Sequence, residues 1–355
     1  MTLLEHTNLA PLSDQLPQRF WTGTSFHAPA VYEVDCSPFD MSDADLQRDS
    51  ELAQLMQRTY DNVGLVLLRN TGLTDPARMR EFAQIIVRED MNYEGGANPR
   101  DMMEGNVYEI GAPLVARLPY HHEMAYVGKS TSLISFLCLD PLPDAGATFV
   151  SDGVASTDAI LATPLGQKLK DLGVCYHRSL TDAENFIGEI GYGVYNHWQK
   201  SFGTNDPAVA QAKAEALGLI VEWGENRLMK TRYYNPAFEY FPALDQNMLY
   251  ASLADHGLWF DTWPLIQHLP FMDRPLHMTY GDDSEFTRDE LQQFIDVYDQ
   301  FGTKLDWARG DVAVICNYRF AHGRPGIVLG EGETRKLGVL LGKQFDRVGQ
   351  RNDKW

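Results

Sequence analysis

The chain lacks paired cysteines, because its four cysteines (Cys36, Cys138, Cys175 and Cys316) are scattered over 355 residues. Disulfide frameworks and cysteine zinc sites need cysteines at recurring close spacings. Cys138 and Cys316 lie within apolar runs, which is typical of buried thiols in a reducing compartment. We therefore expect free thiols, and neither a disulfide scaffold nor a zinc cluster.

Long apolar runs are also missing. The first residues, Met-Thr-Leu-Leu-Glu-His-Thr, contain no basic stretch followed by an apolar one, so no signal peptide is visible. No apolar run reaches the length of roughly 20 residues that a membrane-spanning helix needs. The expected location is the cytoplasm.

Positive charge is scarce. The chain has 30 Lys and Arg against 49 Asp and Glu, a formal net charge of -19. Such a surface repels phosphate backbones and anionic bilayers, so nucleic acids and membranes are poor candidates for partners. The simplest interpretation of the charge is a soluble, self-repelling surface. A hydrophobic content of 44% and an aromatic content of 11% are those of a folded globular protein.

Internal repeats, low-complexity tracts and Gly/Ser linkers are absent as well, so the chain is interpreted by its hydrophobic periodicity. Residues 1–40 have no sustained period and are interpreted as an irregular N-terminal arm. Helices are expected over 43–62, from Asp75 onward, over 158 to about 195, over 206–217 and over 288–301. Strands are expected over 63–69, 106–112, 131–139, 147–151, 228–234, 247–252, 311–317 and 335–342.

Strands therefore bracket a long and mostly helical middle, at about residues 158–300. This pattern predicts a mixed α+β, mainly β, fold: one domain over residues 1–355 with a large helical insertion, rather than two independent domains.

The chemistry-bearing feature is His121-His122-Glu123, which is followed about 200 residues later by Ala321-His322-Gly323-Arg324. A His-x-Glu pair plus a distant His is the ligand set of a non-haem Fe(II) site, which keeps open positions for O2 and a co-substrate. If 120–126 is a strand, alternate side chains share a face, and His121 and Glu123 point away from His122. The pattern predicts His121, Glu123 and His322 as metal ligands, and His122 as a bystander or a supporting residue.

Two other interpretations remain open for these residues. Zinc competes for two histidines and one carboxylate, as in hydrolases. No His-Glu-x-x-His sequence is present to carry the usual zinc hydrolase chemistry. A non-catalytic jelly roll that binds a metal or an acid is the second alternative.

The residues around both histidine blocks resemble the taurine dioxygenase/TfdA family, in its clavaminate synthase-like version with Glu as the ligand. The resemblance spans roughly residues 60 to 342. It is carried by Leu118–Tyr126, Leu133–Pro141, Ala145–Asp152, Tyr176–Leu180, His197–Asp206 and Trp307–Arg324.

The resemblance implies a double-stranded β-helix (jelly roll), the cofactor Fe(II), and the co-substrates 2-oxoglutarate and O2. Thr148 matches the threonine that touches the co-substrate in the family, although the turn before it reads Ala-Gly-Ala instead of Gly-Gly-Glu. Arg335, on the strand after His322, matches the arginine that pairs with the far carboxylate of 2-oxoglutarate, for which a planar guanidinium is suited. The expected reaction is hydroxylation of an unactivated C–H bond with release of succinate and CO2; desaturation and cyclisation are the alternatives within the same cofactor class.

Substrate contacts are assigned only as candidates. Arg232 could pair with a substrate carboxylate, Trp198 could belong to a lid, and Arg324 could contact the substrate; structural roles and core packing are the competing interpretations. The expected substrate is a small amino acid or an amino-acid-derived or carboxylate metabolite, either free or linked to a carrier.

Overall fold

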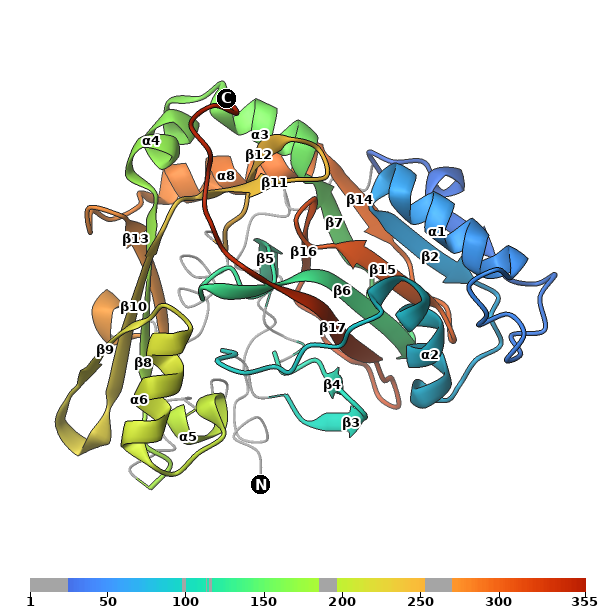
Figure 1. Ribbon diagram of the computed structural model, residues 1–355, viewed down its shortest axis with the longest axis horizontal. Coiled ribbons are helices and arrows are strands. Elements are labelled where there is room, and N and C mark those ends of the chain that lie inside the picture. Colours follow the sequence, from blue (N-terminus) through green and yellow to red (C-terminus); the bar gives the residue numbers. More distant parts are fainter. Residues whose placement is uncertain (1–24, 98–99, 113, 115–116, 185–196, 253–269) are drawn as a thin grey trace.

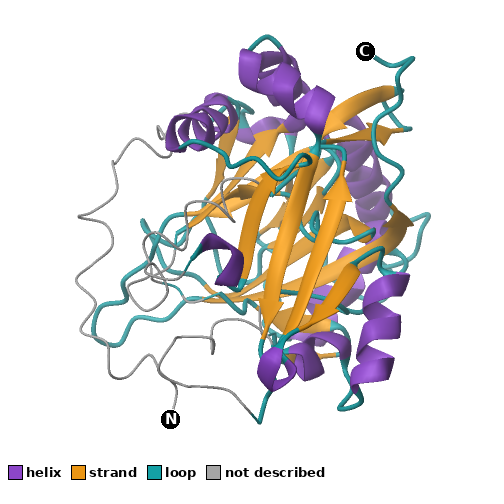
Figure 2. Cartoon of the chain, turned by 90° about the vertical axis from the view of Figure 1, so that its left-hand side faces the viewer, coloured by secondary structure: helices purple, strands orange, loops and turns teal. Residues whose placement is uncertain are grey.

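The computed structural model describes residues 25–97, 100–112, 114, 117–184, 197–252 and 270–355, and it shows a mixed α+β molecule built on three main sheets (Figure 1). Figure 2 shows strands running through the middle of the molecule with helices at its edges. The described helices are α1 Glu51–Val63, α2 Pro76–Val87, α3 Gly153–Leu161, α4 Pro164–Leu172, α5 Trp198–Phe202, α6 Pro207–Ala216 and α8 Arg288–Gln300, with short 3-10 turns at Pro29–Val31, Glu225–Arg227 and Phe271–Asp273.

The largest sheet has seven strands. Their order is β1 (Glu33–Asp35), β2 (Leu65–Arg69), β15 (Val312–Cys316), β6 (Lys129–Asp140), β17 (Lys336–Asp346), β4 (Val107–Glu109) and β3 (Met102–Glu104). Only the β1–β2 pair is parallel. The last strand in the sequence, β17, therefore lies inside the sheet, between β6 and β4.

The apolar run of β2 shows why this sheet is buried on both faces. Val66 and Leu68 pack in one cluster with apolar residues of α1 and α2, such as Met56 and Phe82. Leu65 and Leu67, which alternate with them, belong to a second cluster on the opposite face. A continuous run of large apolar residues is typical of a strand covered on both sides, and each buried side chain stabilises the fold by about 1.5–3 kcal/mol.

The second sheet has four antiparallel strands, in the order β14 (Gly302–Leu305), β7 (Thr148–Asp152), β16 (Phe320–Arg324) and β5 (Leu118–His121). Its apolar residues, including Tyr120, Val150 and Ala321, share one core cluster with Phe136 and Val339 of the seven-stranded sheet. The two sheets therefore enclose a common interior.

The third sheet contradicts the prediction of a mostly helical middle. It contains β13 (Leu276–Tyr280), β8 (Val174–Leu180), β10 (Met229–Asn235) and β9 (Ile220–Trp223), and the hairpin β11 (Phe238–Phe241) and β12 (Gln246–Leu249) lies in the same stretch of sequence. Residues 174–180 were predicted to be helical, but all seven are buried in β8, which pairs with β10 on one side and β13 on the other. Pairing between distant strands overrode the local spacing. The first part of that predicted helical stretch is confirmed, because most of 158–172 lies in α3 and α4; residues 181–184 are not helical, and 185–195 lie outside the described residues.

Two further predictions need correction. The first helix begins at Glu51 rather than at residue 43, because the Ser50 side chain accepts a hydrogen bond from the Ala53 N–H and caps it there. The arm is not wholly irregular, since Glu33–Asp35 pairs with β2; its residues 1–24 lie outside the described part.

Several elements were predicted correctly. Helix α2 begins at Pro76 behind an Asp75 cap, and α8 begins with a capping box formed by Thr287 and Glu290. Strands β6, β10, β15 and β17 lie within about three residues of their predicted ranges, apart from the longer C-terminal end of β17. All four cysteines are free and buried, as the sequence indicated.

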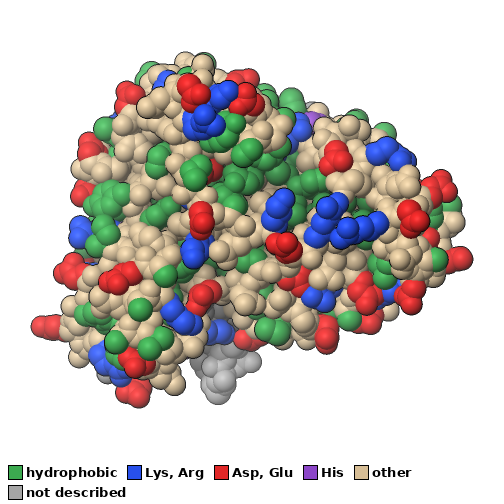
Figure 3. All heavy atoms as spheres, viewed as in Figure 1, with side chains coloured by type: hydrophobic (Ala, Val, Ile, Leu, Met, Phe, Trp, Pro, Cys, Tyr) green, Lys and Arg blue, Asp and Glu red, His purple; other side chains and the backbone are tan. Residues whose placement is uncertain are grey.

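The surface agrees with the acidic composition. Acidic side chains lie mostly around the edges of the face seen in Figure 3, and hydrophobic side chains gather in its upper middle. Among the described helices, none combines the length and apolarity that crossing a bilayer requires.

Candidate metal centre and its cavity

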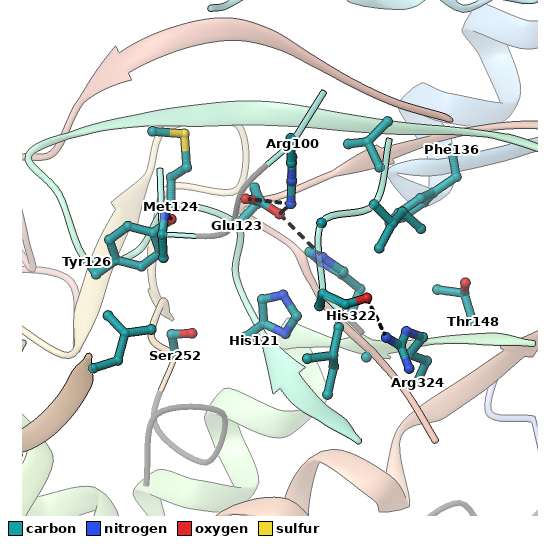
Figure 4. A pocket seen from close by; sticks show the side chains of 18 of the residues that line it. Arg100, His121, Glu123, Met124, Tyr126, Phe136, Thr148, Ser252, His322 and Arg324 are labelled. Carbon is teal, nitrogen blue, oxygen red and sulfur yellow. Dashed lines mark hydrogen bonds and ion pairs between the residues drawn. The ribbon is translucent and has the colours of Figure 1, made fainter. Parts of the chain in front are cut away.

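A cavity of about 770 Å³, its solvent-filled mouth included, brings together most of the residues singled out in the sequence. Figure 4 shows His121, Glu123, Thr148, His322 and Arg324 around it. Its wall consists of Ala97, Arg100, Ile110, Gly111, Ala112, Leu118, His121, Glu123, Met124, Tyr126, Phe136, Thr148, Ser252, Leu276, His322, Gly323, Arg324, Arg335 and Val339.

The two candidate histidine ligands face each other across neighbouring strands. His322 of β16 is the direct antiparallel partner of His121 of β5, and their ring centroids are 4.3 Å apart. Gly323 permits this approach, since a Cβ there would lie 2.6 Å from the Leu118 carbonyl oxygen. His322 lies within β16, which the sequence did not predict and which follows the predicted strand over 311–317.

Glu123 completes a group of three. Potential ligand atoms of His121, Glu123 and His322 all lie within 4.8 Å of one another. The strand ends at His121, so Glu123 lies in the following turn, and the condition that 120–126 forms a strand is not met. His122 is fully buried on the other side, stacked on Tyr250 at 4.7 Å, and it does not line the cavity. Burial lowers the pKa of His122 to about 3.

The donor atoms fit a divalent metal such as Fe(II). His121 Nδ1 lies 2.8 Å from the Pro119 carbonyl oxygen, which can only accept, so the proton is on Nδ1 and the lone pair is on Nε2. Burial, followed by the nearby imidazoles and Arg100, lowers the pKa of His322 well below its ordinary value, which keeps that ring neutral. Two neutral imidazoles and a carboxylate are the donor set that non-haem iron sites use.

Asn317 fixes the backbone of the candidate ligand Glu123. Its side-chain oxygen accepts from the Glu123 N–H at 2.9 Å, and its amide nitrogen donates to the Glu123 carbonyl at 3.0 Å. The same amide donates to the Thr131 carbonyl at 2.8 Å. Asn317 follows β15 directly and precedes β16, which carries His322, so it links the connection between these two strands to the turn that carries Glu123.

Arg100 holds the carboxylate of Glu123 and was not singled out by the sequence. Its Nη2 lies 3.2 Å from one carboxylate oxygen and 3.1 Å from the other (Figure 4). The guanidinium lies over the Tyr93 ring at 4.4 Å. No sequence signal could have found it, since Arg100 belongs to no periodic segment and to none of the blocks that resemble the family.

The candidate co-substrate residues lie together at the other end of the cavity. Arg335, directly before β17, donates through Nε to the Gly146 carbonyl at 2.8 Å, and its Nη2 lies 3.5 Å from Thr148 Oγ1. Trp307 donates to the same Thr148 oxygen at 3.0 Å. Burial lowers the pKa of Arg335 to about 10, so the side chain stays charged at neutral pH. It has no ion pair with a carboxylate of the described residues, which leaves its charge available to an anion.

The three candidate substrate contacts are placed differently. Arg324 lines the cavity, but its N–H groups donate to the backbone carbonyls of Ala112, Leu114 and Pro325. Arg232 and Trp198 are not among the residues of the cavity wall.

Trp198 is fully buried, with the Trp223 ring edge-on at 5.5 Å and the Arg227 guanidinium at 5.1 Å. Arg232 of β10 is the cross-strand neighbour of His177 of β8. Both lie on one face of the third sheet, whereas Leu276, which lines the cavity, lies on the other face.

A second group of potential ligands lies on that opposite face. Donor atoms of Cys175, His177 and Asp283 also fall within 4.8 Å of one another. His177 Nε2 lies 3.0 Å from Thr279 Oγ1, and the Asp283 carboxylate accepts from the Tyr234 hydroxyl at 2.9 Å. Burial, together with the nearby His277 and Arg232, lowers the pKa of His177 to about 4.

Comparison with known proteins agrees with the chemistry of the cavity. Residues 28–340 match the family model described as "Taurine catabolism dioxygenase TauD, TfdA family". A clavaminate synthase-like protein of Arabidopsis thaliana is 26% identical over 266 residues, which are 74% of this chain and 77% of that protein. The dapdiamide synthesis protein DdaC of Enterobacter agglomerans is 20% identical over 302 residues, which are 84% of this chain and 87% of that protein.

The fold is also found among solved structures. A putative alpha-ketoglutarate-dependent taurine dioxygenase from Burkholderia xenovorans superposes with a TM-score of 0.52 at 14% identity. The superposition covers 91% of this chain and 93% of that one.

Proposed function

The chain belongs to the TauD/TfdA dioxygenase family, and from this premise we propose that it is an Fe(II)/2-oxoglutarate-dependent oxygenase that hydroxylates an unactivated C–H bond of a small amino-acid-like or carboxylate metabolite. The family identifies an oxidoreductase whose cofactor is Fe(II) and whose co-substrates are 2-oxoglutarate and O2. Residue roles, substrate and product are the proposal.

One observation carries the proposal: His121, Glu123 and His322 lie around one point of a cavity whose wall also contains Arg335, a partly buried arginine without a carboxylate partner in the described residues. A metal site alone would also suit a hydrolase. A charged arginine on the same wall, without a carboxylate partner in the described chain, is suited to a co-substrate with a second carboxylate.

When bound, iron and the keto acid supply the oxidising power for C–H hydroxylation, with succinate and CO2 as the by-products. The protein's own task is positioning and exclusion of water. His121, Glu123 and His322 would bind the metal through one face, and Arg335 with Thr148 would orient the far carboxylate of the co-substrate. Phe136 and Val339 line the wall nearby with apolar surface that displaces solvent.

The proposed architecture is a double-stranded β-helix core within a single domain. The seven-stranded and four-stranded sheets that share one interior support it, together with the fold similarity to the taurine dioxygenase-like structure. The stretch of about 158–300 would be the insertion, and it contributes Ser252 and Leu276 to the cavity wall.

The proposed substrate is free or carrier-linked. Similarity to the dapdiamide synthesis protein supports an amino-acid-derived metabolite. The four buried free thiols support a reducing compartment, with the cytoplasm as our proposal.

An anaerobic titration tests the proposed function. Fe(II) and 2-oxoglutarate added to the protein should produce a weak visible charge-transfer band, and air should then yield succinate. His121→Ala should abolish the band, while His122→Ala should keep it if the protein remains folded. No band and no succinate with the wild-type protein would refute the oxygenase.

A further inference from the structure

We propose that Arg100 receives a carboxylate of the substrate, so that the substrate is a short free acid that reacts close to its carboxylate end. This inference rests on the proposed function and specifies the substrate class for the same cavity. Arg100 stands at the metal-facing end of the wall, beside Glu123 (Figure 4).

The guanidinium of Arg100 is buried but incompletely bonded. Its side chain is only 7% exposed, and Nη2 makes both contacts to Glu123. Nε and Nη1 have no hydrogen-bond partner within the described residues. Buried guanidinium N–H groups are strongly driven to find acceptors, and a substrate carboxylate could accept from Nη1 while Nη2 stays with Glu123.

Charge at the site also favours an anion. A guanidinium keeps its proton throughout the ordinary pH range, so Arg100 is a permanent cation. The Glu123 charge that it faces would be shared with the metal once the metal binds. A guanidinium that loses part of its counter-charge becomes a better receptor for a second carboxylate.

The other two arginines of the wall are already engaged or assigned. Arg324 donates to three backbone carbonyls. Arg335 lies beside Thr148, where the co-substrate is proposed to bind. Only Arg100 has two N–H-bearing nitrogens without acceptors in the described part of the wall and also contacts a candidate metal ligand.

Counting charges over the wall gives the same result. Three arginines and a divalent metal, set against one glutamate and a doubly negative keto acid, leave two positive charges in excess. Glu123 is the single carboxylate residue of the described wall. A low-dielectric cavity with such an excess favours an anionic substrate over a neutral or cationic one.

Position then restricts the length of the acid and where it reacts. Because Arg100 touches both oxygens of a candidate metal ligand, a carboxylate bound to it would keep the first few carbons of the acid next to the metal. A monocarboxylic acid that is linked to a carrier as a thioester has no free carboxylate and would leave Arg100 without an acceptor. Arg232, the candidate singled out in the sequence, lies on the far face of the third sheet and cannot take this role.

Binding to the protein loaded with Mn(II) and the unreactive analogue N-oxalylglycine provides the test. The probes are C3–C6 alkanoates and α-amino acids, each paired with its primary amide, and calorimetry measures the affinities. Wild-type protein should bind acids of at least one series about 10- to 100-fold more tightly than their amides, the range expected for a charged hydrogen bond. Arg100→Gln should remove this preference, and Arg100→Lys should keep part of it, because the charge remains without the planar fork.

Arg232→Gln is the matched control and should preserve the full preference. Equal binding of acids and amides by the wild-type protein, or a preference that survives in Arg100→Gln, would overturn the inference. Loss of the Fe(II)/2-oxoglutarate band in both Arg100 variants would also overturn it, since Arg100 would then only position Glu123. If the wild-type protein itself lacks that band, the proposed oxygenase function is refuted. Failure of the function can therefore be told apart from failure of the Arg100 inference.

Discussion

Among the residues that the structure describes, two groups of potential metal ligands have similar spacing and different surroundings. In each, three potential donor atoms lie within 4.8 Å of one another. His121, Glu123 and His322 face a cavity between two sheets, whereas Cys175, His177 and Asp283 lie on the outer side of the third sheet, where the Asp283 side chain is 57% exposed.

The difference lies in what the donor atoms already do. In the cavity, a backbone carbonyl binds the Nδ1 of His121 and leaves its Nε2 lone pair for a metal. On the outer face, the donors of His177 and Asp283 contact Thr279 and Tyr234, and the Arg232 cation stands directly opposite His177. Each group has an arginine beside it, Arg100 at Glu123 and Arg232 opposite His177, so the difference lies in the cavity that the first group faces and in the Nε2 lone pair that His121 keeps free.

The largest expected effect separates the two groups directly. Glu123→Ala should lower Fe(II) affinity by more than about 100-fold, because even residues that only orient a ligand contribute 10- to 100-fold. Cys175→Ser should leave Fe(II) affinity unchanged. Equilibrium dialysis with Fe(II) under anaerobic conditions measures both, and a loss of affinity in Cys175→Ser would mean that the outer group is the metal site.

The next effect concerns the co-substrate end of the cavity. Arg335→Gln should raise the KM for 2-oxoglutarate about 100- to 1000-fold, since a charge pair inside the cavity would be lost. Its exposed neighbour Lys336, changed to Gln, should leave this KM within about twofold. Succinate release at varied 2-oxoglutarate concentration measures the effect; equal KM values in both variants would remove Arg335 from the co-substrate site.

A pH effect on stability is expected from the outer group. Because burial lowers the pKa of His177 to about 4, the unfolded chain takes up a proton near its ordinary value of 6.5 while the folded protein does not. The free energy of unfolding should therefore decrease by at most about 3 kcal/mol as the pH falls from about 6.5 to about 4, because each pKa unit corresponds to 1.36 kcal/mol. His177→Gln should flatten this part of the curve, which urea unfolding at several pH values can measure. An unchanged slope would show that His177 is readily protonated in the folded state.

The smallest effect isolates the cation of the outer face. Arg232→Gln should raise the pKa of His177, because a like charge opposite the ring is removed. The shift should be a fraction of a unit and is measurable by NMR titration of the imidazole. Succinate release should stay within about twofold, and a large loss of activity would bring Arg232 back as a substrate contact.

The cavity residues could be predicted further than the fold around them. His121, Glu123, His322, Thr148 and Arg335 were singled out from short sequence blocks, and all five line one cavity. His121 and Glu123 were selected because alternate side chains of a strand share a face, but the strand ends before Glu123. The resulting orientation is kept by the turn, in which Met124 has a φ of +56°.

Other features depend on contacts that no local pattern contains. β8 is a strand because β10 and β13 pair with it from positions about 50 and 100 residues later, and its own spacing resembled a helix. Arg100 reaches Glu123 from a segment without periodicity, so only the folded chain shows the contact.

Asn317 has a consequence for the order of events during synthesis. The turn that it anchors is made 194 residues before Asn317 itself. At about 5–20 residues per second on the ribosome, roughly 10–40 s pass between the two. During that interval the nascent chain contains His121 and Glu123. It still lacks His322, the third candidate ligand, and Asn317, which anchors the turn of Glu123. Iron acquisition should therefore be a late step in the biogenesis of this protein, after β15 to β17 have closed the fold.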